Sequence, residues 1–442
     1  MNWLANKIKT YTHRPAIIYN SQIYTYENLF QKIEYYGTKY SSLHHKIVLL
    51  QGVYNFNTIA LFFALAEKSN YICTVTNIDP FVLMEKEKLL CPDAIINVNE
   101  NEDFLTHIDK KRELNPLLNK LQETHNPGVI LFSSGTSGSP KVLLHDLNLL
   151  LKPYQSITMK DYNILSLLDF DHIGGLDILF RQLSAGATQT IPLNKTPPYI
   201  CSLIEKHKVS VFSASPTFYN LLFLNDEYKN YNLQSLEILA YGSEPMPQWL
   251  LNRLVSEFPN AALQQKYGLS ETNAIRIKSI SGSLFFKIND PSVEYKVIDN
   301  VLWIKSVSQS LGYLNLPNYE LQKDGWFCTG DLVEINADGN IRIIGRETDI
   351  INVGGEKVLP QEVENILMQL PFIADCKVKG VSNSIMGQAV VAEIVTSGNL
   401  SQDIMKAEMR KFLSGYLDRY KIPSKFIFLD NITISERFKK TR

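Results

Sequence analysis

Short apolar runs alternate along the first two thirds of the chain with segments whose apolar residues recur at helical spacing. Residues 46–50 and 71–75 are strongly apolar, and the segment from Phe56 to Glu67 between them has helical periodicity. The same alternation returns at residues 209–213 and 236–240. Nearly continuous apolar strands separated by helices are typical of a largely parallel sheet covered by helices. We therefore expect an α/β fold whose larger part is built of βαβ units.

The pattern changes from about residue 290 onward. Apolar and polar residues alternate at 294–298 and 301–304, and Gly, Asn and Asp turns separate these short segments. Alternation with a period of two predicts strands that have one buried face. We expect a β-rich subdomain at about residues 285–345.

The remainder of the chain has the pattern of strand, turn, helix and strand. Helical spacing covers Gln361 to Leu370 and Ile404 to Tyr420, which predicts a small α+β domain. The glycine-rich pair Gly354-Gly355 follows the expected boundary. We expect a large domain over residues 1–347 and a small, mobile C-terminal domain over residues 348–442.

Charge and cysteine content exclude several classes of protein. The chain has 44 Lys plus Arg and 45 Asp plus Glu residues, so it offers no broad positive field for nucleic acid or an anionic membrane. Its 5 cysteines form no C-x-x-C pair, which indicates neither a zinc site nor a disulfide framework. The longest apolar run, residues 59–66, is too short to span a bilayer. We expect a cytoplasmic protein with no membrane span and no nucleic-acid partner.

A loop of small residues follows the apolar strand pattern of residues 129–132. Main-chain N–H groups in such a loop can converge on an anion, hydroxyl groups add donors, and a lysine adds a point charge. A Walker A loop is excluded, because Pro140 and Val142 stand where that motif needs Gly and Ser or Thr. A solvated Ser/Gly turn is the competing interpretation. The predicted phosphate site comprises Ser133, Ser134, Gly135, Thr136, Ser137, Gly138 and Lys141.

The loop resembles the signature S/T-S-G-S/T-S/T-G-x-P-K-G of the adenylate-forming enzymes, which include acyl-CoA synthetases, peptide-synthetase adenylation domains and luciferases. Val142 replaces the final glycine. A single motif of this kind is weak, whereas many in the expected order are specific. The other segments that resemble family motifs are residues 25–29 (T-Y-x-x-L), 242–245 (G-x-x-P), 267–271 (Y-G-x-T/S-E), 325–331 (G-W-x-x-T-G-D) and 345–364 (the hinge motif and its sequel).

This resemblance implies a site for ATP and Mg²⁺. Glu271 suits Mg²⁺ because a hard dication prefers carboxylate oxygen and bridges to phosphate oxygens, and Ser270 is implied at the α-phosphate. Asp331 can accept hydrogen bonds from ribose hydroxyls, and Arg346 can support ribose or phosphate. Outside these motifs each charged residue would be interpreted as a surface charge. The adenine side is implied to comprise Gly242, Ser243, Glu244, Pro245, Tyr267 and Gly268.

His172 lies in a segment similar to the family element P-x-F-H-x-x-G. The resemblance implies that its imidazole guides the entering carboxylate, and a core histidine is the competing interpretation. Asp169 and Asp171 depart from the family pattern. An extra carboxylate near the acyl end could pair with a substrate amine, which keeps an amino-acid substrate open.

The last residues of the chain resemble the family stretch that carries a catalytic lysine. Setting Arg442 on the final arginine of that stretch places Lys439 on the lysine, whose charge would stabilise the adenylation transition state. Lys440 is the rival at a shift of one residue, and a solvated basic tail is a further alternative. Glu271 and Thr136 complete the predicted catalytic set.

The resemblance also implies two poses of the small domain, one that presents the lysine and one that presents a Gly-Gly loop to the acceptor thiol. The hinge position matches Thr348, which is β-branched and therefore stiffer than the usual residue. Gly354 and Gly355 would line the path of the thiol of CoA or of phosphopantetheine on a separate carrier protein. Phe438 stands where the family has glycine.

Together these residues predict a ligase that activates a small carboxylic acid as an acyl-adenylate, releases pyrophosphate and then forms a thioester. Three alternatives stay open: a nucleotide-binding scaffold of the same fold that is impaired in catalysis, an amino-acid-activating adenylation enzyme, and a luciferase-like oxygenase. The acyl pocket is not evident from the sequence. Residues 213–219 fall where pocket-lining segments occur in the family, but such apolar residues suit a core equally well.

Overall fold

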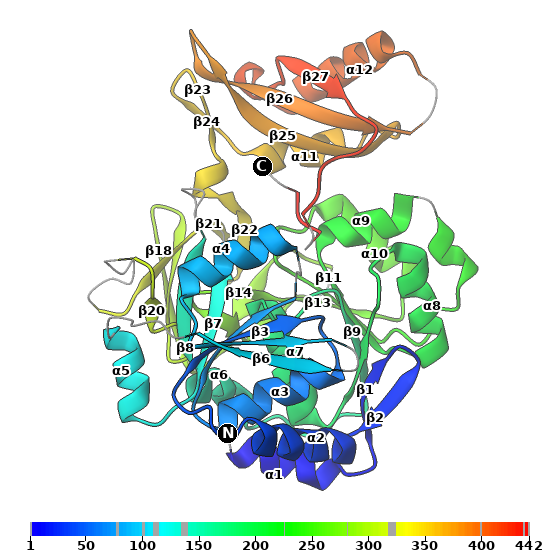
Figure 1. Cartoon of the computed structure of the whole chain (residues 1–442). Coiled ribbons are helices and arrows are strands. Elements are labelled where there is room, and N and C mark those ends of the chain that lie inside the picture. Colours follow the sequence, from blue (N-terminus) through cyan, green and yellow to red (C-terminus); the bar gives the residue numbers. More distant parts are fainter. Residues whose placement is uncertain are drawn as a thin grey trace.

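The computed structural model describes residues 2–76, 79–99, 102–108, 115–133, 140–224, 226–280, 282–316, 324–397, 400–435 and 438–440. Figure 1 shows a large body that contains the N-terminal end and a smaller unit stacked on one side of it. Strands and helices alternate through the body, so the expected α/β class is confirmed. Within the described ranges, none of the helices is long and apolar enough to cross a membrane.

The first sheet of the body has a parallel centre and antiparallel edges. Its strands, in spatial order, are β20 (Gly312–Tyr313), β8 (Lys141–Asp146), β7 (Gly128–Ser133), β4 (Tyr71–Val75), β3 (Ile47–Gly52), β5 (Ala94–Val98) and β6 (Asp103–His107). The pairs β3–β4, β3–β5 and β4–β7 are parallel, and the pairs that involve β6, β8 and β20 are antiparallel. The strands β3 and β4 are buried along their whole length, because helices cover both faces of the sheet centre.

The second sheet is parallel except at one edge. Its strands, in spatial order, are β13 (Ala262–Gln265), β12 (Ile238–Tyr241), β11 (Val211–Ala214), β9 (Asn163–Ser166), β10 (Thr188–Ile191), β1 (Pro15–Tyr19) and β2 (Gln22–Thr25). Only β2 is antiparallel to its neighbour among these strands. Parallel strands present their carboxyl ends at one edge, so the segments that follow β11, β12 and β13 leave the sheet on the same side.

Helices fill the space between the two sheets and cover their other faces. The helices α1 (Asn2–Tyr11), α2 (Tyr26–Lys39), α3 (Phe56–Glu67), α6 (Leu147–Leu151) and α7 (Ile173–Ala185) share one core with strands of both sheets. The first sheet also packs against α4 (Pro80–Leu90) and α5 (Pro116–Glu123), and the second against α8 (Pro197–His207), α9 (Pro216–Leu224) and α10 (Gln248–Glu257). Asn55 caps α3 by accepting a hydrogen bond from the Thr58 N–H.

An antiparallel sheet forms the third part of the body. Its strands, in spatial order, are β16 (Ile277–Ser279), β17 (Phe286–Ile288), β22 (Ile341–Arg346), β21 (Phe327–Ile335), β19 (Val301–Ser306) and β18 (Val293–Ile298). The alternating segments of the sequence therefore become β18 and β19. The hairpin of β14 (Tyr267–Leu269) and β15 (Asn273–Ile275) precedes this sheet, and Ile275 belongs to its core.

The smaller unit has its own hydrophobic core. It comprises β23 (Ile351–Val353), β24 (Glu356–Val358), α11 (Pro360–Leu367), β25 (Ile373–Asn383), β26 (Gly387–Thr396), α12 (Gln402–Ser414) and β27 (Lys425–Phe428). A short 3-10 turn, Glu347–Asp349, joins it to the body and contains Thr348. The domain limits and the hinge at Thr348 stay predictions.

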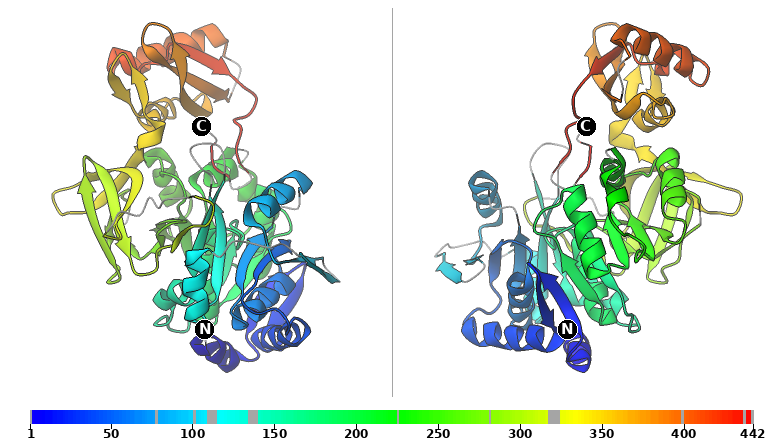
Figure 2. Two further views of the ribbon diagram at one scale, coloured as in Figure 1. Left: turned by 60° about the vertical axis from the view of Figure 1, so that its left-hand side comes forward. Right: turned by 90° about the vertical axis from the view of Figure 1, so that its right-hand side faces the viewer.

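The segment after β27 returns from the smaller unit to the body, as the views of Figure 2 show. The ring of Phe438 packs edge-on against Phe218 of α9, with ring centroids 5.0 Å apart. The Ser215 hydroxyl donates a hydrogen bond of 2.7 Å to the Phe438 carbonyl. Phe438 adopts a φ of 53°, which is unusual for a residue with a side chain. We call this segment, Ser435 with residues 438–440, the tail.

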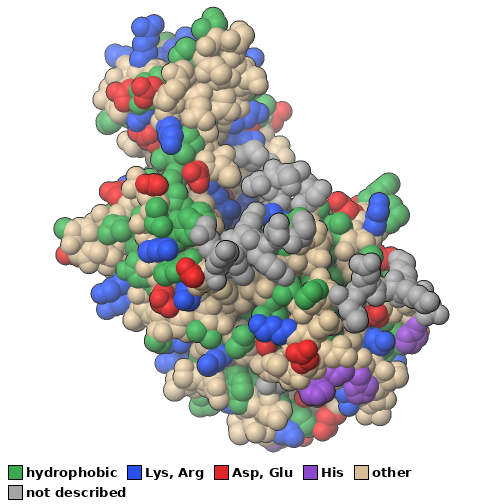
Figure 3. Space-filling model, turned by 90° about the vertical axis from the view of Figure 1, so that its left-hand side faces the viewer, with side chains coloured by type: hydrophobic (Ala, Val, Ile, Leu, Met, Phe, Trp, Pro, Cys, Tyr) green, Lys and Arg blue, Asp and Glu red, His purple; other side chains and the backbone are tan. Residues whose placement is uncertain are grey.

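Basic and acidic side chains are intermixed on the face of the molecule shown in Figure 3, as the near-zero net charge suggests. Because charges of both signs are intermixed, this face has no extended region of positive or negative potential. Any anion site must therefore be local.

Candidate active site

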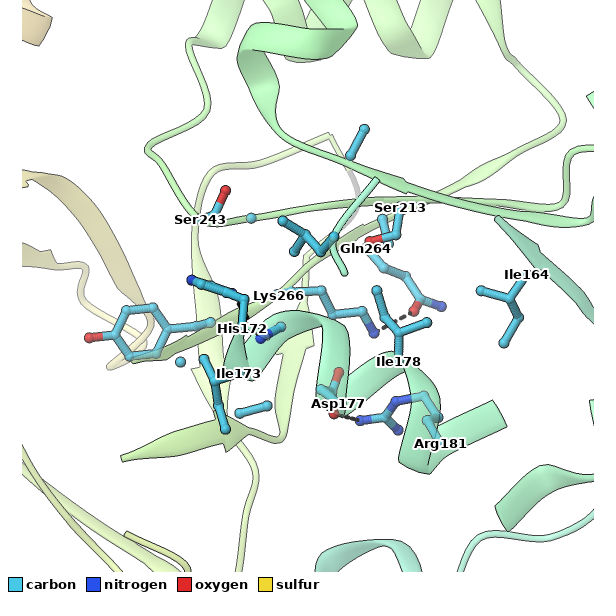
Figure 4. Close-up of a pocket in the computed structure, with 18 of the residues that line it drawn as sticks. Ile164, His172, Ile173, Asp177, Ile178, Arg181, Ser213, Ser243, Gln264 and Lys266 are labelled. Atoms are coloured by element: carbon cyan, nitrogen blue, oxygen red, sulfur yellow. Dashed lines mark hydrogen bonds and ion pairs between the residues drawn. The ribbon is translucent and has the colours of Figure 1, made fainter. Parts of the chain in front are cut away.

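A cavity of about 480 Å³ opens at the carboxyl ends of β11, β12 and β13. Figure 4 shows Ser243 and His172 toward one end of it, Ile164 and Arg181 toward the other, and Lys266 with Gln264 between them. We call the end lined by Ser133, Glu271, Arg346 and Lys439 the interdomain end, and the part around Asp177, Arg181, Gln264 and Lys266 the distal end. This is the edge of a parallel sheet at which open α/β folds bind ligands.

The predicted phosphate loop connects β7 to β8, where Ser133 pairs with Lys141 in antiparallel register. Ser133 lines the cavity, and its hydroxyl oxygen is buried with no hydrogen-bond partner among the described residues. A buried polar atom without a partner is costly unless a ligand or water satisfies it, so this hydroxyl fits a bound phosphate. The predicted site residues Ser134, Gly135, Thr136, Ser137 and Gly138 lie outside the described residues.

Glu271 lines the interdomain end, and Ser270 lies beside it on the cavity wall. The Tyr313 hydroxyl donates a hydrogen bond of 3.0 Å to Glu271 Oε1. The ammonium group of Lys141 lies 5.1 Å from the centre of the Tyr313 ring. Tyr313 therefore links the carboxylate to the strand that follows the phosphate loop, a contact that sequence reasoning missed.

Mg²⁺ fits this end through a single carboxylate. Among the described residues no cluster of three or more His, Cys, Asp and Glu side chains could hold a metal ion by itself. Mg²⁺ is commonly held by one or two carboxylates together with phosphate oxygens of the substrate. Glu271 therefore suits an ion that arrives with a nucleotide rather than a permanent metal site.

Asp331 is held by two partners beside the cavity. The Tyr267 hydroxyl donates a hydrogen bond of 2.7 Å to Asp331 Oδ2, and Arg346 Nε lies 3.0 Å from Oδ1. Asp331 and Arg346 face each other because they are register partners in β21 and β22. Burial raises the pKa of Asp331, although Arg346 and Tyr267 oppose this. A carboxylate can accept more than two hydrogen bonds, so ribose hydroxyls can still bind here.

Tyr267 and Gly268 both line the cavity. One face of the Tyr267 ring stacks on Phe286, with ring centroids 5.7 Å apart, and its pKa is raised well above the usual value, first by burial and then by Asp331. Gly268 has to lack a side chain, because a Cβ there would lie 2.6 Å from the Asn273 carbonyl oxygen.

Of the G-x-x-P segment, Gly242 and Ser243 line the cavity, directly after β12. A Cβ on Gly242 would lie 2.7 Å from the Lys266 carbonyl oxygen, so the close approach of these two strand ends requires glycine. Glu244 turns toward α9, where Oε1 accepts a hydrogen bond of 2.8 Å from the Thr217 N–H. Neither Glu244 nor Pro245 is among the described cavity-lining residues, and their nucleotide roles stay predictions.

His172 is the N-terminal cap of α7 and lines the cavity. Its Nδ1 accepts a hydrogen bond of 3.1 Å from the Gly174 N–H, which leaves Nε2 as the protonated nitrogen of the neutral ring. Asp169 forms an ion pair of 2.8 Å with Lys195. Asp169 and Asp171 are not among the described cavity-lining residues, and a pairing of either with a substrate amine stays a prediction.

The two rival lysines of the tail have different surroundings. Lys439 lines the cavity at the interdomain end. Lys440 Nζ instead donates hydrogen bonds of 2.7 Å to both Asp375 Oδ1 and the Cys376 carbonyl in the smaller unit. Burial alone would lower the pKa of Lys440, but Asp375 and Glu364 raise it above its usual value. The geometry therefore places Lys439 at the cavity and Lys440 in a contact with the smaller unit, and the catalytic role of Lys439 stays a prediction.

Gly354 and Gly355 form the tip of the β23–β24 hairpin in the smaller unit, and both have positive φ. They are exposed and do not belong to the described wall of the cavity. Their role on the thiol path stays a prediction, because it requires a different pose of the smaller unit.

Sequence reasoning missed the polar residues at the distal end. Asp177 and Arg181 are one helical turn apart in α7, and Lys266 and Gln264 lie at the end of β13. The available signals were the i, i+4 spacing of opposite charges and a lysine directly before Tyr267. Neither signal by itself distinguishes a cavity wall from a surface.

Comparisons with known proteins match two family models to the chain. A family model described as AMP-binding enzyme matches residues 59–299, and one described as AMP-binding enzyme C-terminal domain matches residues 362–439. The 2-succinylbenzoate–CoA ligase of Staphylococcus epidermidis is 26% identical over 479 residues, which cover 100% of this chain and 96% of that protein. The 4-coumarate-CoA ligase 1 of Narcissus pseudonarcissus is 28% identical over 68% of this chain, and the chain spans only 61% of that ligase.

Solved structures confirm the fold. An o-succinylbenzoate CoA synthetase from Bacillus subtilis, in complex with the acyl-adenylate intermediate, superposes with a TM-score of 0.80 at 20% identity and covers 99% of this chain and 96% of that chain. An anthranilate CoA ligase in complex with anthranoyl-AMP has a TM-score of 0.84 at 16% identity, over 99% of this chain and 95% of that chain.

Proposed function

The chain belongs to the AMP-binding enzyme family, and from that premise we propose that it is an ATP-dependent ligase for a small carboxylic acid. The first half-reaction joins the acid to AMP and releases pyrophosphate. The second transfers the acyl group to the thiol of CoA or of a carrier-protein phosphopantetheine. The observation that carries the proposal is one cavity whose wall includes Ser133, Glu271, Arg346 and Lys439.

In the first half-reaction the carboxylate oxygen attacks the α-phosphorus, and the bond from that phosphorus to pyrophosphate breaks. Negative charge spreads over the phosphate oxygens, so the catalytic need is for fixed donors and cations in a site that excludes water. The Ser133 hydroxyl and the Lys439 ammonium group would serve the phosphates. Glu271 would hold Mg²⁺, which neutralises phosphate charge when it is bound.

The remaining residues of this end would position the substrates. Asp331 would accept the ribose hydroxyls, and Arg346 and Tyr267 would keep its carboxylate oriented. Nε2–H of His172 would direct the entering carboxylate toward the α-phosphorus. In the second half-reaction the acceptor thiolate attacks the acyl carbon and AMP leaves, with Gly354 and Gly355 beside the thiol after the smaller unit has rotated near Thr348.

Acid-dependent exchange of pyrophosphate into ATP tests the proposal. We expect exchange with at least one member of a broad acid panel, and we expect Lys439→Ala to lower it by about 10²- to 10³-fold, because one charge that stabilises the transition state is lost. Lys440→Met tests the rival lysine, and Lys406→Ala, on the surface of α12, is the matched control. Tight ATP binding without any exchange would instead identify a nucleotide-binding scaffold. Thioester formation with CoA or with a phosphopantetheine-loaded carrier then identifies the acceptor.

A further inference from the structure

The distal end of the cavity contains an unbalanced set of charges. Arg181 Nη2 lies 3.0 Å from Asp177 Oδ1, and the Tyr154 hydroxyl donates a hydrogen bond of 2.8 Å to the same oxygen. The Asp177 carboxylate is therefore already paired, and only 7% of this residue is exposed. Lys266 adds a second cation to the same wall. Two cations thus share one carboxylate.

Lys266 has only a weak neutral partner. Its ammonium group donates a hydrogen bond of 3.3 Å to Gln264 Oε1, and no ion pair involves it within the part of the chain that the structure describes. Burial, reinforced by Arg181 and opposed by Asp177, lowers the pKa of Lys266 to about 8. At neutral pH the amine is still mostly protonated, so the cavity wall holds a positive charge that no described carboxylate offsets.

Arg181 also presents open surface to this space. It lines the cavity with 42% of its side chain accessible, while its partner Asp177 is covered. In Figure 4 the side chain of Lys266 extends toward Gln264 and that of Arg181, on α7, toward Asp177, with Ile178 between the two side chains in this view. A ligand group between them would meet donors from two directions.

Apolar side chains line the space around these cations. Ile164, Ile178, Val211 and Ile238 belong to the cavity wall. Such a wall suits an apolar middle section of an acid, whereas an ammonium group on the ligand would face an excess of like charge. A wholly apolar tail would bury both cations without a partner, which is costly.

We propose that the acid which this chain activates bears a second carboxylate at its far end, and that Lys266 and Arg181 bind this distal carboxylate. The proposal rests on the proposed adenylation function and names its substrate class: dicarboxylic acids with an apolar segment between the two groups. One carboxylate reacts at the interdomain end near Lys439 and His172. The other carboxylate binds at the distal end, so Lys266 and Arg181 determine substrate specificity and take no part in the bond-making step.

The test compares matched pairs of acids in acid-dependent pyrophosphate exchange. Each pair consists of a dicarboxylic acid and its monomethyl ester. The diacids are the linear acids from glutaric to suberic acid and the benzene dicarboxylic acids. For the best pair we expect kcat/KM to favour the diacid by about 10- to 100-fold, since hydrogen bonds to charged groups are worth about 1.5–3 kcal/mol. Lys266→Met should remove most of this preference through a higher KM, with kcat little changed. Lys266→Arg should retain it.

Lys287→Met, which changes an exposed lysine of β17, is the control for the loss of a charge elsewhere. A second measurement, of thermal unfolding, separates a loss of binding from misfolding of the variant. The diacid, added with a non-hydrolysable ATP analogue, should raise the midpoint of thermal unfolding of the wild type and of Lys287→Met. It should not raise the midpoint of Lys266→Met. Exchange that is equal for diacids and monoesters, or a preference that survives Lys266→Met, would overturn the inference while the ligase function stands. No exchange with any acid would overturn both.

Discussion

Two buried carboxylates, Asp331 beside the cavity and Asp177 in its wall, differ in the charge balance of their surroundings. At the interdomain end, Asp331 faces one cation, Arg346, and one hydroxyl, that of Tyr267. At the distal end, Asp177 faces Arg181 while Lys266 stands beside them without a carboxylate of its own. The first group is neutral as a whole, and the second is positive.

The difference indicates what each end is suited to recognise. A neutral group can orient a carboxylate that still has lone pairs available for uncharged hydroxyls, without attracting other anions. In a group with excess positive charge, the cations repel each other while the site is empty. A bound anion relieves this repulsion, and the relief adds to the binding free energy of the ligand. The predictions below separate the two ends.

Removing the carboxylate at the interdomain end should have the largest effect. Asp331→Ala should raise the KM for ATP by about 100-fold, because the ribose loses its acceptor and Arg346 loses its partner. The factor should be the same for every acid, since Asp331 is proposed to contact the ribose and not the acid. Steady-state kinetics with two different acids measure it, and Asp338→Ala, in an exposed turn, is the control. A factor that depends on the acid would contradict the separation of the ends.

Removing the excess charge at the distal end should make the empty protein more stable. The folded pKa of Lys266 is about 8 against a usual 10.5. Below pH 8 both states hold the proton and the full cost of burying it is present; between pH 8 and 10.5 the unfolded chain binds more protons, so wild-type stability rises there.

Lys266→Met should therefore raise the free energy of unfolding by about 2 kcal/mol at pH 7, a value reduced for the water that reaches the cavity. The advantage should vanish near pH 10. Denaturant titrations at pH 7 and pH 10 measure both values. If Lys266→Met were less stable than the wild type at pH 7, the charge of Lys266 would not destabilise the folded protein.

The smallest effect is expected from removing the negative charge of Asp177 at the distal end. Asp177 supports the protonated form of Lys266, so Asp177→Asn should lower the pKa of Lys266 further. The preference for diacids should then fall off at a lower pH than in the wild type, with a loss of about 10-fold at pH 8. Lys160 and His172 also line the cavity, so the profile is compared with that of the monoesters, which report titration elsewhere. If the preference for diacids fell off at the same alkaline pH in the wild type and in Asp177→Asn, this would contradict an effect of Asp177 on the pKa of Lys266.

The sequence allowed the interdomain end to be predicted largely because its residues lie in contiguous motifs at strand ends. Glu271 and Tyr267 belong to one short segment, and Asp331 and Arg346 meet through the register of β21 and β22. Glu244 shows the limit of this reasoning: a residue inside a motif contacts the Thr217 N–H at the start of α9, and no motif reveals which way a side chain turns.

The distal end could not be predicted, because its polar residues come from separate elements. Arg181 reaches the cavity only because α7 packs across the second sheet, and Lys266 because β13 adjoins β12. On a helix surface the Asp177–Arg181 spacing normally indicates a solvated ion pair. Packing between distant elements turns this ordinary pair into part of a cavity wall.

Phe438 has a consequence for the timing of catalysis. The ring is wedged against Phe218, and its carbonyl is held by Ser215, at a φ of 53° that costs about 1–2 kcal/mol for a side-chain-bearing residue. Withdrawing the tail would separate two aromatic rings and break a hydrogen bond, at a cost of roughly 2 kcal/mol that release of the backbone strain would partly offset. The proposed rotation of the smaller unit would begin with this step. A glycine would lack the ring contact and would adopt this φ without strain, but its carbonyl could still accept the hydrogen bond from Ser215. In the proposed two-pose cycle, this aromatic anchor would lengthen the dwell time of the pose that presents Lys439 to the cavity.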